Sequence, residues 1–234
     1  MKIQYIIYLC ICMISTSITG MEVIKKILTD SPGITPPNAQ LTITTPRLTL
    51  SLLKTDDASS MYYALSTTPT IYEWMHWPQP IPQNFLGPYV AYIASLIAQK
   101  RIEKGVYLAL CLREKDTNNF CGSVALHSFD TKNKTADIAY WCCQAQQKKG
   151  YITEATNALI RYAFANHQHE IHTLYIKCDN ENEASYKVAE KLNAKLEYSS
   201  YNMVEKPGCP LGSRLSRRYS ISNAKNLPPL NIQY

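Results

Sequence analysis

The most informative part of the chain is a nine-residue segment that reads Gln147-Lys148-Lys149-Gly150-Tyr151-Ile152-Thr153-Glu154-Ala155. An apolar, strand-like run precedes it, and apolar residues at helical spacing follow it. The segment therefore joins a strand to a helix, and the helix presents its free N–H groups and the positive end of its dipole to the turn. Gly150 permits close approach of a ligand, and two lysines add positive charge. This combination predicts an anion-binding turn, although an ordinary basic turn would have the same residues.

The flanking sequence alternates between strand-like and helix-like periodicity. Before the segment, the pattern predicts a strand, two helices and a meander of three strands, at 47–53, 56–65, 85–102, 106–112, 121–129 and 136–143. After it, the pattern predicts a helix, a strand, a helix and two strand-like runs, at 152–166, 171–178, 182–192 and up to 217–221. A meander followed by β-α-β units predicts an α/β domain of the α+β kind, with a mixed sheet and helices on both faces.

Composition divides the chain into four parts: an apolar leader at 1–20, a proline-containing arm at 21–45, the folded domain at 46–222 and a tail at 223–234. The leader has a positive start, a short apolar run and small residues, which is the layout of a secretory signal peptide. Its apolar run is shorter than the roughly 20 residues of a membrane span, so we expect no stable membrane insertion. The alternative is that Met21 is the functional start and that 1–20 is an upstream extension.

The overall composition excludes several classes of protein. The chain has 234 residues, of which 46% are hydrophobic and 18% charged, so a core can be buried and wholesale disorder is not expected. The net charge of +6 is too small for a dedicated DNA or RNA binder, but it suits a protein that handles an anionic small molecule. The eight cysteines include no Cys-x-x-Cys pair and no His/Cys cluster with zinc spacing, so we expect reduced thiols and no metal site.

The segment that begins at Gln147 resembles the Q/R-x-x-G-x-G/A loop of the GNAT acetyltransferase superfamily, which binds the pyrophosphate of acetyl-CoA. Three further segments resemble the RimJ/RimL-type branch of that superfamily: Trp74-Met75-His76-Trp77-Pro78, the strand Asn133–Trp141, and Asn182-Glu183-Ala184-Ser185. The four segments occur in the expected order and span most of residues 46–221. Each is a weak signal alone, but four in register are a strong one.

The resemblance implies the GNAT fold, with a mostly antiparallel sheet of six to seven strands, and acetyl-CoA as co-substrate. It implies that backbone donors for the oxyanion lie near Trp141–Cys143. The cofactor-binding residues that it implies are Trp141, Cys142, Cys143, Gln147, Lys148, Lys149, Gly150, Tyr151, Ile152, Thr153 and Asn182. Ile152 stands where the family usually has Gly or Ala; because this position contributes only its backbone N–H, we expect binding to survive the β-branched side chain.

The resemblance also implies catalytic roles. Ser185 is the expected hydroxyl near the CoA sulfur, where it donates a hydrogen bond or a proton to the departing thiolate, although a polar residue in the first turn of a helix is common anyway. Asp137 is the expected general base, with His127 and His76 as other candidates, and each of the three also has a purely structural interpretation. A dedicated base is not strictly required, because a protein α-amine titrates at about pH 8.

Several further residues keep two interpretations. Asn182 either hydrogen-bonds the pantetheine arm or only caps its helix. Trp74 and Trp77 either wall the acceptor groove or pack the first two helices against the sheet. A basic cluster near the carboxyl terminus is most simply a solvated edge strand, with the 3′-phosphate of CoA or an acidic acceptor protein as alternatives. This cluster consists of Arg214, Arg217 and Arg218.

The sequence thus predicts an acetyl-CoA-dependent N-acetyltransferase that transfers the acetyl group directly to a primary amine, in the first place a protein N-terminal α-amine. A small-molecule amine such as a polyamine is an alternative acceptor. The competing functions are a catalytically inert CoA-binding protein, acting as a sensor or partner domain, and an RNA- or ribosome-binding module. Because acetyl-CoA is a cytosolic metabolite, we expect a cytoplasmic monomer or homodimer, with export by the leader as the alternative.

Overall fold

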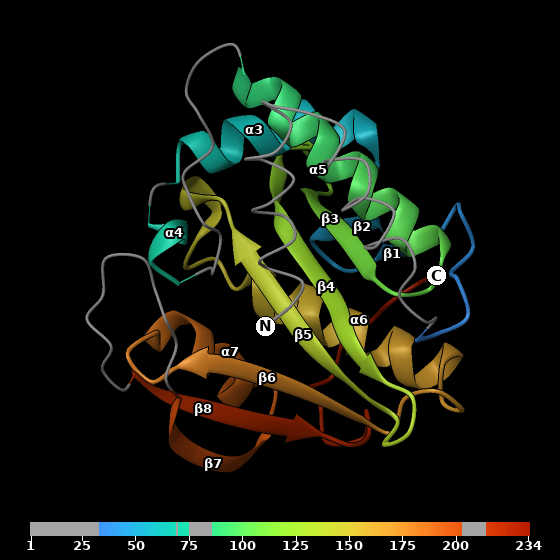
Figure 1. Cartoon of the computed structure of the whole chain (residues 1–234), viewed down its shortest axis with the longest axis vertical. Coiled ribbons are helices and arrows are strands. Elements are labelled where there is room, and N and C mark those ends of the chain that lie inside the picture. Colours follow the sequence, from blue (N-terminus) through green and yellow to red (C-terminus); the bar gives the residue numbers. More distant parts are fainter. Residues whose placement is uncertain (1–32, 69, 75–85, 203–213) are drawn as a thin grey trace, which may run out of the picture.

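Eight strands form one continuous sheet in the computed structural model, which describes residues 33–68, 70–74, 86–202 and 214–234 (Figure 1). The predicted leader and residues 21–32 of the predicted arm lie outside these residues. In chain order the strands are β1 (Thr42–Thr44), β2 (Leu48–Leu52), β3 (Leu108–Glu114), β4 (Phe120–Asp130), β5 (Thr135–Cys142), β6 (Thr173–Asp179), β7 (Lys195–Asn202) and β8 (Arg214–Ile221). The order in the sheet is β1-β2-β3-β4-β5-β6-β8-β7. β5 and β6 are parallel and the other neighbours antiparallel, which confirms the predicted mixed, mostly antiparallel sheet.

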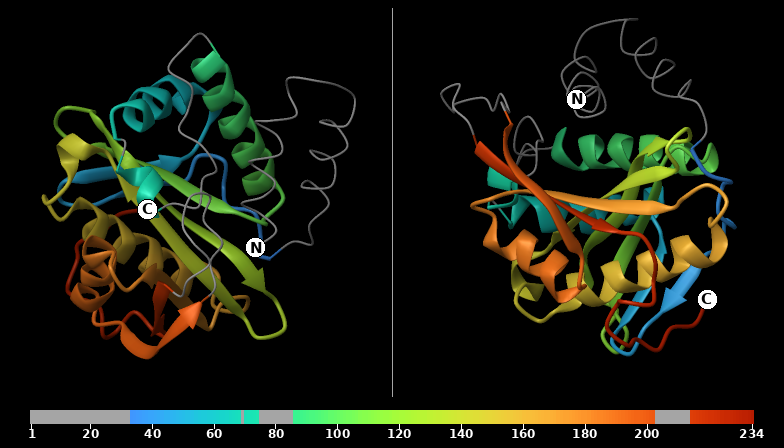
Figure 2. Two further views of the ribbon diagram at one scale, coloured as in Figure 1. Left: turned by 60° about the vertical axis from the view of Figure 1, so that its left-hand side comes forward. Right: turned by 90° about the horizontal axis from the view of Figure 1, so that it is seen from below.

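Helices cover both faces of this sheet, as predicted (Figure 2). On one face lie α3 (Ala58–Ser66), the short α4 (Ile71–Trp74) and α5 (Leu86–Glu103), with α3 in contact with β4 and α5 in contact with β3. On the other face lie α6 (Tyr151–Asn166) and α7 (Glu183–Lys191). Two 3-10 helices, η1 (Thr55–Asp57) and η2 (Gln144–Gln146), stand ahead of α3 and α6. Among the helices that the structure describes, none has both the length and the apolar character needed to cross a membrane.

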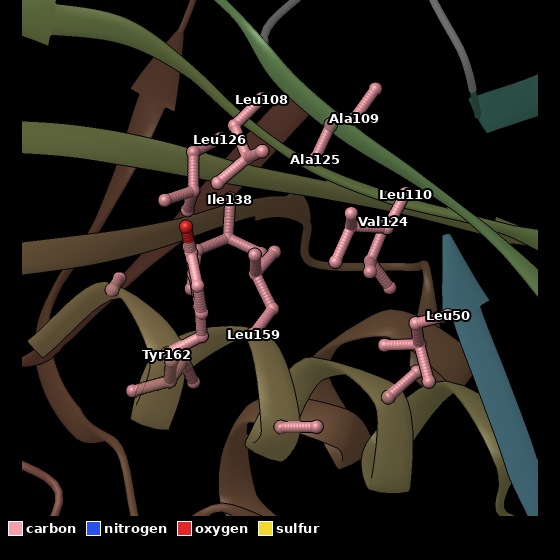
Figure 3. Close-up of a cluster of buried hydrophobic side chains, with 14 of the residues drawn as sticks. Leu50, Leu108, Ala109, Leu110, Val124, Ala125, Leu126, Ile138, Leu159 and Tyr162 are labelled. Carbon is pink, nitrogen blue, oxygen red and sulfur yellow. The ribbon is translucent and has the colours of Figure 1, made fainter. Parts of the chain in front are cut away.

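The centre of the core lies between the sheet and α6. Alternate residues of a strand point to the same face, so Leu108 and Leu110 of β3 meet Val124 and Leu126 of β4 above Leu159 of α6 (Figure 3). All five side chains are fully buried. Burial of one such side chain stabilises the fold by about 1.5–3 kcal/mol, so this layer holds α6 firmly against the strands.

The two ends of the described chain add to the domain more than the sequence predicts. β1 lies inside the predicted arm and makes the sheet eight-stranded instead of six- to seven-stranded, because three residues are too few for an alternating pattern to be recognised. The predicted tail also packs on the domain. Thr44 and Gln233 exchange backbone hydrogen bonds of 2.8 and 3.0 Å, and the Pro228 carbonyl accepts hydrogen bonds from Asn157 and Arg161 of α6.

The basic strand β8 is not an edge strand, which corrects the simplest interpretation of the arginine cluster. β8 lies between β6 and β7 and pairs with both. Arg217 and Arg218 are accommodated inside the sheet because their guanidinium groups stack on tyrosine rings. Arg217 lies 4.0 Å from the ring centre of Tyr186, and Arg218 lies 3.6 Å from that of Tyr175.

Candidate functional site

A gap opens between the two parallel strands at the centre of the sheet. β5 and β6 pair only along Thr135–Ile138 and Thr173–Ile176, although both strands continue beyond this point. The continuations, Ala139–Cys142 and Lys177–Asp179, diverge from each other (Figure 1). Backbone groups on their facing edges have no strand partner across the gap, so they are available to a ligand that lies between the strands.

The pairing of β4 with β5 identifies the N–H groups that face this gap. Cys143 donates its N–H to the carbonyl of Cys121 over 2.8 Å. Because antiparallel ladders alternate, Trp141 also directs its N–H to β4, whereas Tyr140 and Cys142 direct theirs into the gap. The predicted donor set therefore changes. Cys142 remains in the donor set and Tyr140 is added to it, whereas the N–H groups of Trp141 and Cys143 bond to β4. The sequence does not reveal this, because the alternation of apolar residues along β5 does not say which of its N–H groups point to β4 and which to the gap.

The helix α6 begins beside the gap. Its N-cap is Gly150, whose φ of 82° is a left-handed conformation that glycine adopts without strain. The first intrahelical hydrogen bond runs from the Glu154 N–H to the Gly150 carbonyl, so the N–H groups of Tyr151–Thr153 have no acceptor within the helix. Together with the helix dipole, these N–H groups form the cradle that the sequence predicts for an anion.

The side chains of the turn have separate contacts. Ile152 is half-buried and packs against the core, which accommodates its β-branched side chain. Gln147 Nε2 donates to the Cys142 carbonyl over 3.4 Å and so ties the turn to the end of β5. Lys149 Nζ lies 3.4 Å from the Glu114 carboxylate, so this lysine is already paired. Lys148 is exposed and makes no ion pair with any residue that the structure describes, which leaves its ammonium available to an anion.

A buried carboxylate anchors the turn to the start of β2. Glu154 Oε1 accepts hydrogen bonds from the Thr45 hydroxyl (2.6 Å) and the Arg47 N–H (3.0 Å), and Glu154 Oε2 accepts one from Arg47 Nε (2.7 Å). The Glu154 side chain is only 8% exposed. Arg47 in turn donates to the Lys149 carbonyl over 2.8 Å and lies over the Tyr151 ring. Glu154 and Arg47 therefore fix the backbone of the turn in the conformation that exposes its N–H groups.

The first turn of α7 faces the same gap. Asn182 caps the helix, because its Oδ1 accepts a hydrogen bond from the Ser185 N–H over 3.1 Å. The Tyr140 hydroxyl donates to the Ser185 carbonyl over 3.0 Å, and it lies 3.0 Å from Ser185 Oγ. Either hydroxyl can be the donor in the second contact, and when Tyr140 donates to Oγ the Ser185 proton is available to a ligand in the gap. Tyr140 thus joins β5 to α7 and holds Ser185 at the gap, while burial raises the pKa of the Tyr140 hydroxyl and keeps it protonated.

The cysteines around the gap are uncharged thiols. Burial raises the pKa of Cys142 and of Cys143 to about 12 and the pKa of Cys121 to about 11. Thiolate is the nucleophilic and metal-binding form, so these side chains are weak nucleophiles at neutral pH. Within the described ranges, His, Cys, Asp and Glu side chains form no group of three that could hold a metal ion.

Asp137 lies where the paired part of β5 ends, on the face opposite α6. Its carboxylate accepts a hydrogen bond from Lys177 Nζ of β6 over 2.7 Å, an ion pair that the sequence does not predict. His127 of β4 is its register partner, and burial lowers the pKa of this imidazole, so His127 is neutral at pH 7. The structure therefore places two of the three predicted base candidates side by side. The third, His76, lies outside the described residues.

Trp141 links the site to the helices of the other face. Its side chain is buried against Ala64 and Leu65 of α3 and Ile71 of α4. Trp74 ends α4 on the same side and is half-buried, whereas Trp77 lies outside the described residues. The backbone of β5 thus faces the gap while one of its side chains supports the neighbouring helices.

The structure thus brings several predicted residues together around one gap in the sheet. They are the residues of the turn that begins at Gln147, together with Cys142, Asn182 and Ser185. Four residues of this site have no role among the sequence predictions: Arg47, Tyr140, Glu154 and Lys177. An acid in the first turn of a helix is explained by the helix dipole alone, and a tyrosine or lysine in a strand is unremarkable. Their importance comes from contacts between segments that are far apart in the chain.

Comparison with known proteins agrees with this geometry. Residues 47–195 match the family described as "Acetyltransferase (GNAT) domain". A protein of Bacillus subtilis (strain 168), named "Putative ribosomal N-acetyltransferase YdaF", is 36% identical over 74 residues, which cover 32% of this chain and 39% of that protein.

Solved structures have the same fold. RimL, a ribosomal L7/L12 α-N-protein acetyltransferase in complex with coenzyme A, superposes with a TM-score of 0.68 at 18% identity, over 78% of this chain and 98% of that one. The microcin C7 self-immunity acetyltransferase MccE, in complex with acetyl-CoA and AMP, superposes with a TM-score of 0.65 at 23% identity, over 76% of this chain and 93% of that one.

The Glu154 anchor predicts the effect of its removal. Glu154→Gln should weaken coenzyme A binding about tenfold, because hydrogen bonds to a charged group contribute about 1.5–3 kcal/mol and 1.4 kcal/mol corresponds to a factor of ten. Isothermal titration calorimetry measures the affinity. Glu183→Gln is the matched control, since Glu183 lies in the first turn of α7 and is 61% exposed. Equal affinity of the Glu154 variant and the wild type would show that the anchor does not shape the turn.

Proposed function

The chain belongs to the acetyltransferase (GNAT) family, and we propose that it is an N-acetyltransferase whose acceptor is a protein N-terminal α-amine. The observation that carries the proposal is the gap between β5 and β6, which has an anion cradle at one end and the Ser185 hydroxyl at its edge. Two of the similar proteins are named for acetylation of ribosomal proteins, and one of these is a RimL whose name specifies an α-amine. This likeness supports the choice of acceptor.

The acyl donor is acetyl-CoA, which supplies the acetyl group as a thioester. The residues of this chain fit the donor. The N–H groups of Tyr151–Thr153 and the ammonium of Lys148 suit its pyrophosphate, and Gly150 gives the turn a left-handed conformation, with φ of 82°, that a residue with a side chain would adopt only with strain. The unpaired edge of β5 suits its amide-bearing arm, and the carboxamide N–H groups of Asn182 remain available beside that arm.

Transfer requires donors at the acyl oxygen and a proton for the leaving sulfur. The N–H groups of Tyr140 and Cys142 face the gap, where they are preorganised to stabilise negative charge on that oxygen. As the amine nitrogen bonds to the acyl carbon and the carbon–sulfur bond breaks, the Ser185 hydroxyl donates its proton to the sulfur and regains one from solvent, so that CoA leaves as the thiol. Tyr140 holds this hydroxyl in place from β5.

The amine must lose a proton to attack, and Asp137 is our proposed acceptor of that proton. It lies at the start of the gap, on the face of the sheet opposite α6 and α7, and its carboxylate is 15% exposed. The Lys177 ion pair holds the carboxylate beside the gap, and His127 is its immediate neighbour. An α-amine has a pKa of about 7.7–8.0, so only a modest driving force is needed at neutral pH.

We also propose that the protein works in the cytosol. The proposal rests on its co-substrate, because acetyl-CoA is a cytosolic metabolite. The leader at 1–20 would carry the chain elsewhere only if it served as a signal peptide.

The acceptor is tested by following thiol release from acetyl-CoA with peptides that begin with Ser, Ala or Thr. Spermidine and an N-terminally blocked lysine peptide are the comparison acceptors. We expect turnover with the free N-terminal peptides to exceed that with the other two amines by at least about tenfold, since the α-amine is the more deprotonated at pH 7.5. Preference for spermidine or the lysine side chain would overturn the proposed acceptor.

The partnership of Tyr140 with Ser185 is tested by a double-mutant cycle. Ser185→Ala should lower kcat about 100-fold and leave the KM for acetyl-CoA within about threefold, because the lost proton transfer acts in the chemical step. Tyr140→Phe should lower kcat about tenfold in the wild-type background and have no further effect in Ser185→Ala. Additive losses would show that Tyr140 does not act through Ser185.

The base is tested by the effect of single substitutions on kcat/KM. Asp137→Asn should lower kcat/KM about 100-fold at pH 7. His127→Gln tests the alternative base, which burial keeps neutral at pH 7, and should leave kcat/KM within about threefold. A loss of about 100-fold in His127→Gln together with an unchanged rate in Asp137→Asn would assign the role to His127.

A further inference from the structure

Arg218 is a half-buried cation on the face of the sheet opposite α6 and α7. Arg218 of β8 directs its side chain to the face opposite Tyr219, which is buried under α7. In Figure 1, none of the described helices lies over β6 and β8 on this face. The helices α3 and α5 on this side of the sheet contact β4 and β3 instead. Arg218 is therefore on the same face of the sheet as Asp137, the proposed acceptor of the amine proton.

The Arg218 guanidinium is held in a fixed place. It stacks on the Tyr175 ring at 3.6 Å, and the Tyr198 ring lies 5.8 Å away on the edge strand β7. Stacking on aromatic faces fixes the plane of a guanidinium while its edge stays free for hydrogen bonds. The two rings thus fix the plane of the Arg218 guanidinium.

The charge of Arg218 is only partly compensated. Its Nε is buried without a hydrogen-bond partner, and no carboxylate forms an ion pair with it among the residues that the structure describes. Glu197 of β7, which accepts a hydrogen bond from Ser220 on the same face of β8, attracts it only at longer range. The direct partner of Arg218 across the sheet is Lys177, a like charge that is itself paired with Asp137. A partly desolvated guanidinium beside a second cation favours an anion, and its planar fork fits a carboxylate in two hydrogen bonds.

We propose that Arg218 binds a carboxylate of the acceptor, so that the enzyme prefers N-termini with an acidic residue close behind the acetylated amine. This inference rests on the proposed function, because it takes the α-amine to lie at Asp137. Asp137, Lys177 and Arg218 lie on three neighbouring strands, and the register partner of Asp137 is Tyr175, two residues before Lys177, so the Cα atoms of Arg218 and Asp137 are about 12 Å apart at a strand spacing of about 4.8 Å. An extended peptide advances about 3.3 Å per residue, so the third residue of the acceptor lies about 6.6 Å from the first, and the side chains of a glutamate there and of Arg218 span the remaining distance.

The test compares two acceptor peptides that begin with Ser and differ only by Glu or Gln at the third position. The wild type should acetylate the Glu peptide with a kcat/KM about tenfold higher, and the preference should fall as salt concentration rises. Arg218→Gln should remove the preference and leave the rate on the Gln peptide within about twofold. Arg218→Lys, which keeps the charge but loses the fork, should keep a preference of about threefold.

Lys187→Gln is the control for loss of one positive charge, because Lys187 lies on α7 on the opposite face and is 55% exposed. It should keep the full preference. Coenzyme A affinity and the thermal unfolding midpoint of each variant establish that the fold and the cofactor site are intact.

The outcomes separate the inference from the function on which it rests. Turnover of both peptides without a preference in the wild type, or an equal loss on both in Arg218→Gln, overturns the role of Arg218 alone. No turnover of either peptide overturns the proposed N-terminal acceptor together with this inference. A phosphoserine at the third position tests the other anion that suits an arginine fork. Acceleration by phosphoserine but not by Glu overturns the assignment of a carboxylate.

Discussion

The site depends on one interruption of backbone hydrogen bonding, the end of the β5–β6 pairing after Ile138 and Ile176. Buried backbone groups in a sheet are almost always paired, so an unpaired edge in the middle of an eight-stranded sheet has a large cost unless something else satisfies it. The parallel pairing allows the interruption, because β5 and β6 belong to a β-α-β unit and each strand is held independently on its other side. β4 holds β5 and β8 holds β6, so the two strands can diverge without loss of the core.

The sequence predicts the order of the elements well because each helix and strand has its own periodicity. The helix at 152–166 and the strand at 136–143 are predicted almost to the residue, and the turn between them is found at its predicted place. Strand β1 is missed because three residues are too few to show an alternating pattern. The internal position of β8 is missed because the charged residues of a strand do not reveal which groups their side chains contact. In that case stacking on tyrosine rings replaces solvent as the partner of the arginines.

The candidate site is predictable only in part for the same reason. Gly150 and Ser185 lie in short motifs that a reader of the sequence can find. The anchor from Arg47 to Glu154 joins residues more than a hundred positions apart, and the ion pair of Asp137 with Lys177 joins neighbouring strands on either side of a helix. Such contacts depend on sheet order and register, which hydrophobic patterns do not fix for a mixed sheet.

Trp141 gives β5 a second connection that bears on how the two substrates are bound. The backbone of this strand lines the gap, and the Trp141 side chain packs with residues of α3 and α4 on the other face of the sheet. We therefore expect a ligand that fills the gap and orders β5 to order the packing of those helices as well. If the proposed acceptor binds against these helices, thermodynamic linkage makes the effect reciprocal: whatever factor the first substrate contributes to the affinity of the second, the second returns to the first. The shared strand would then couple the two binding equilibria without any movement of one domain against another.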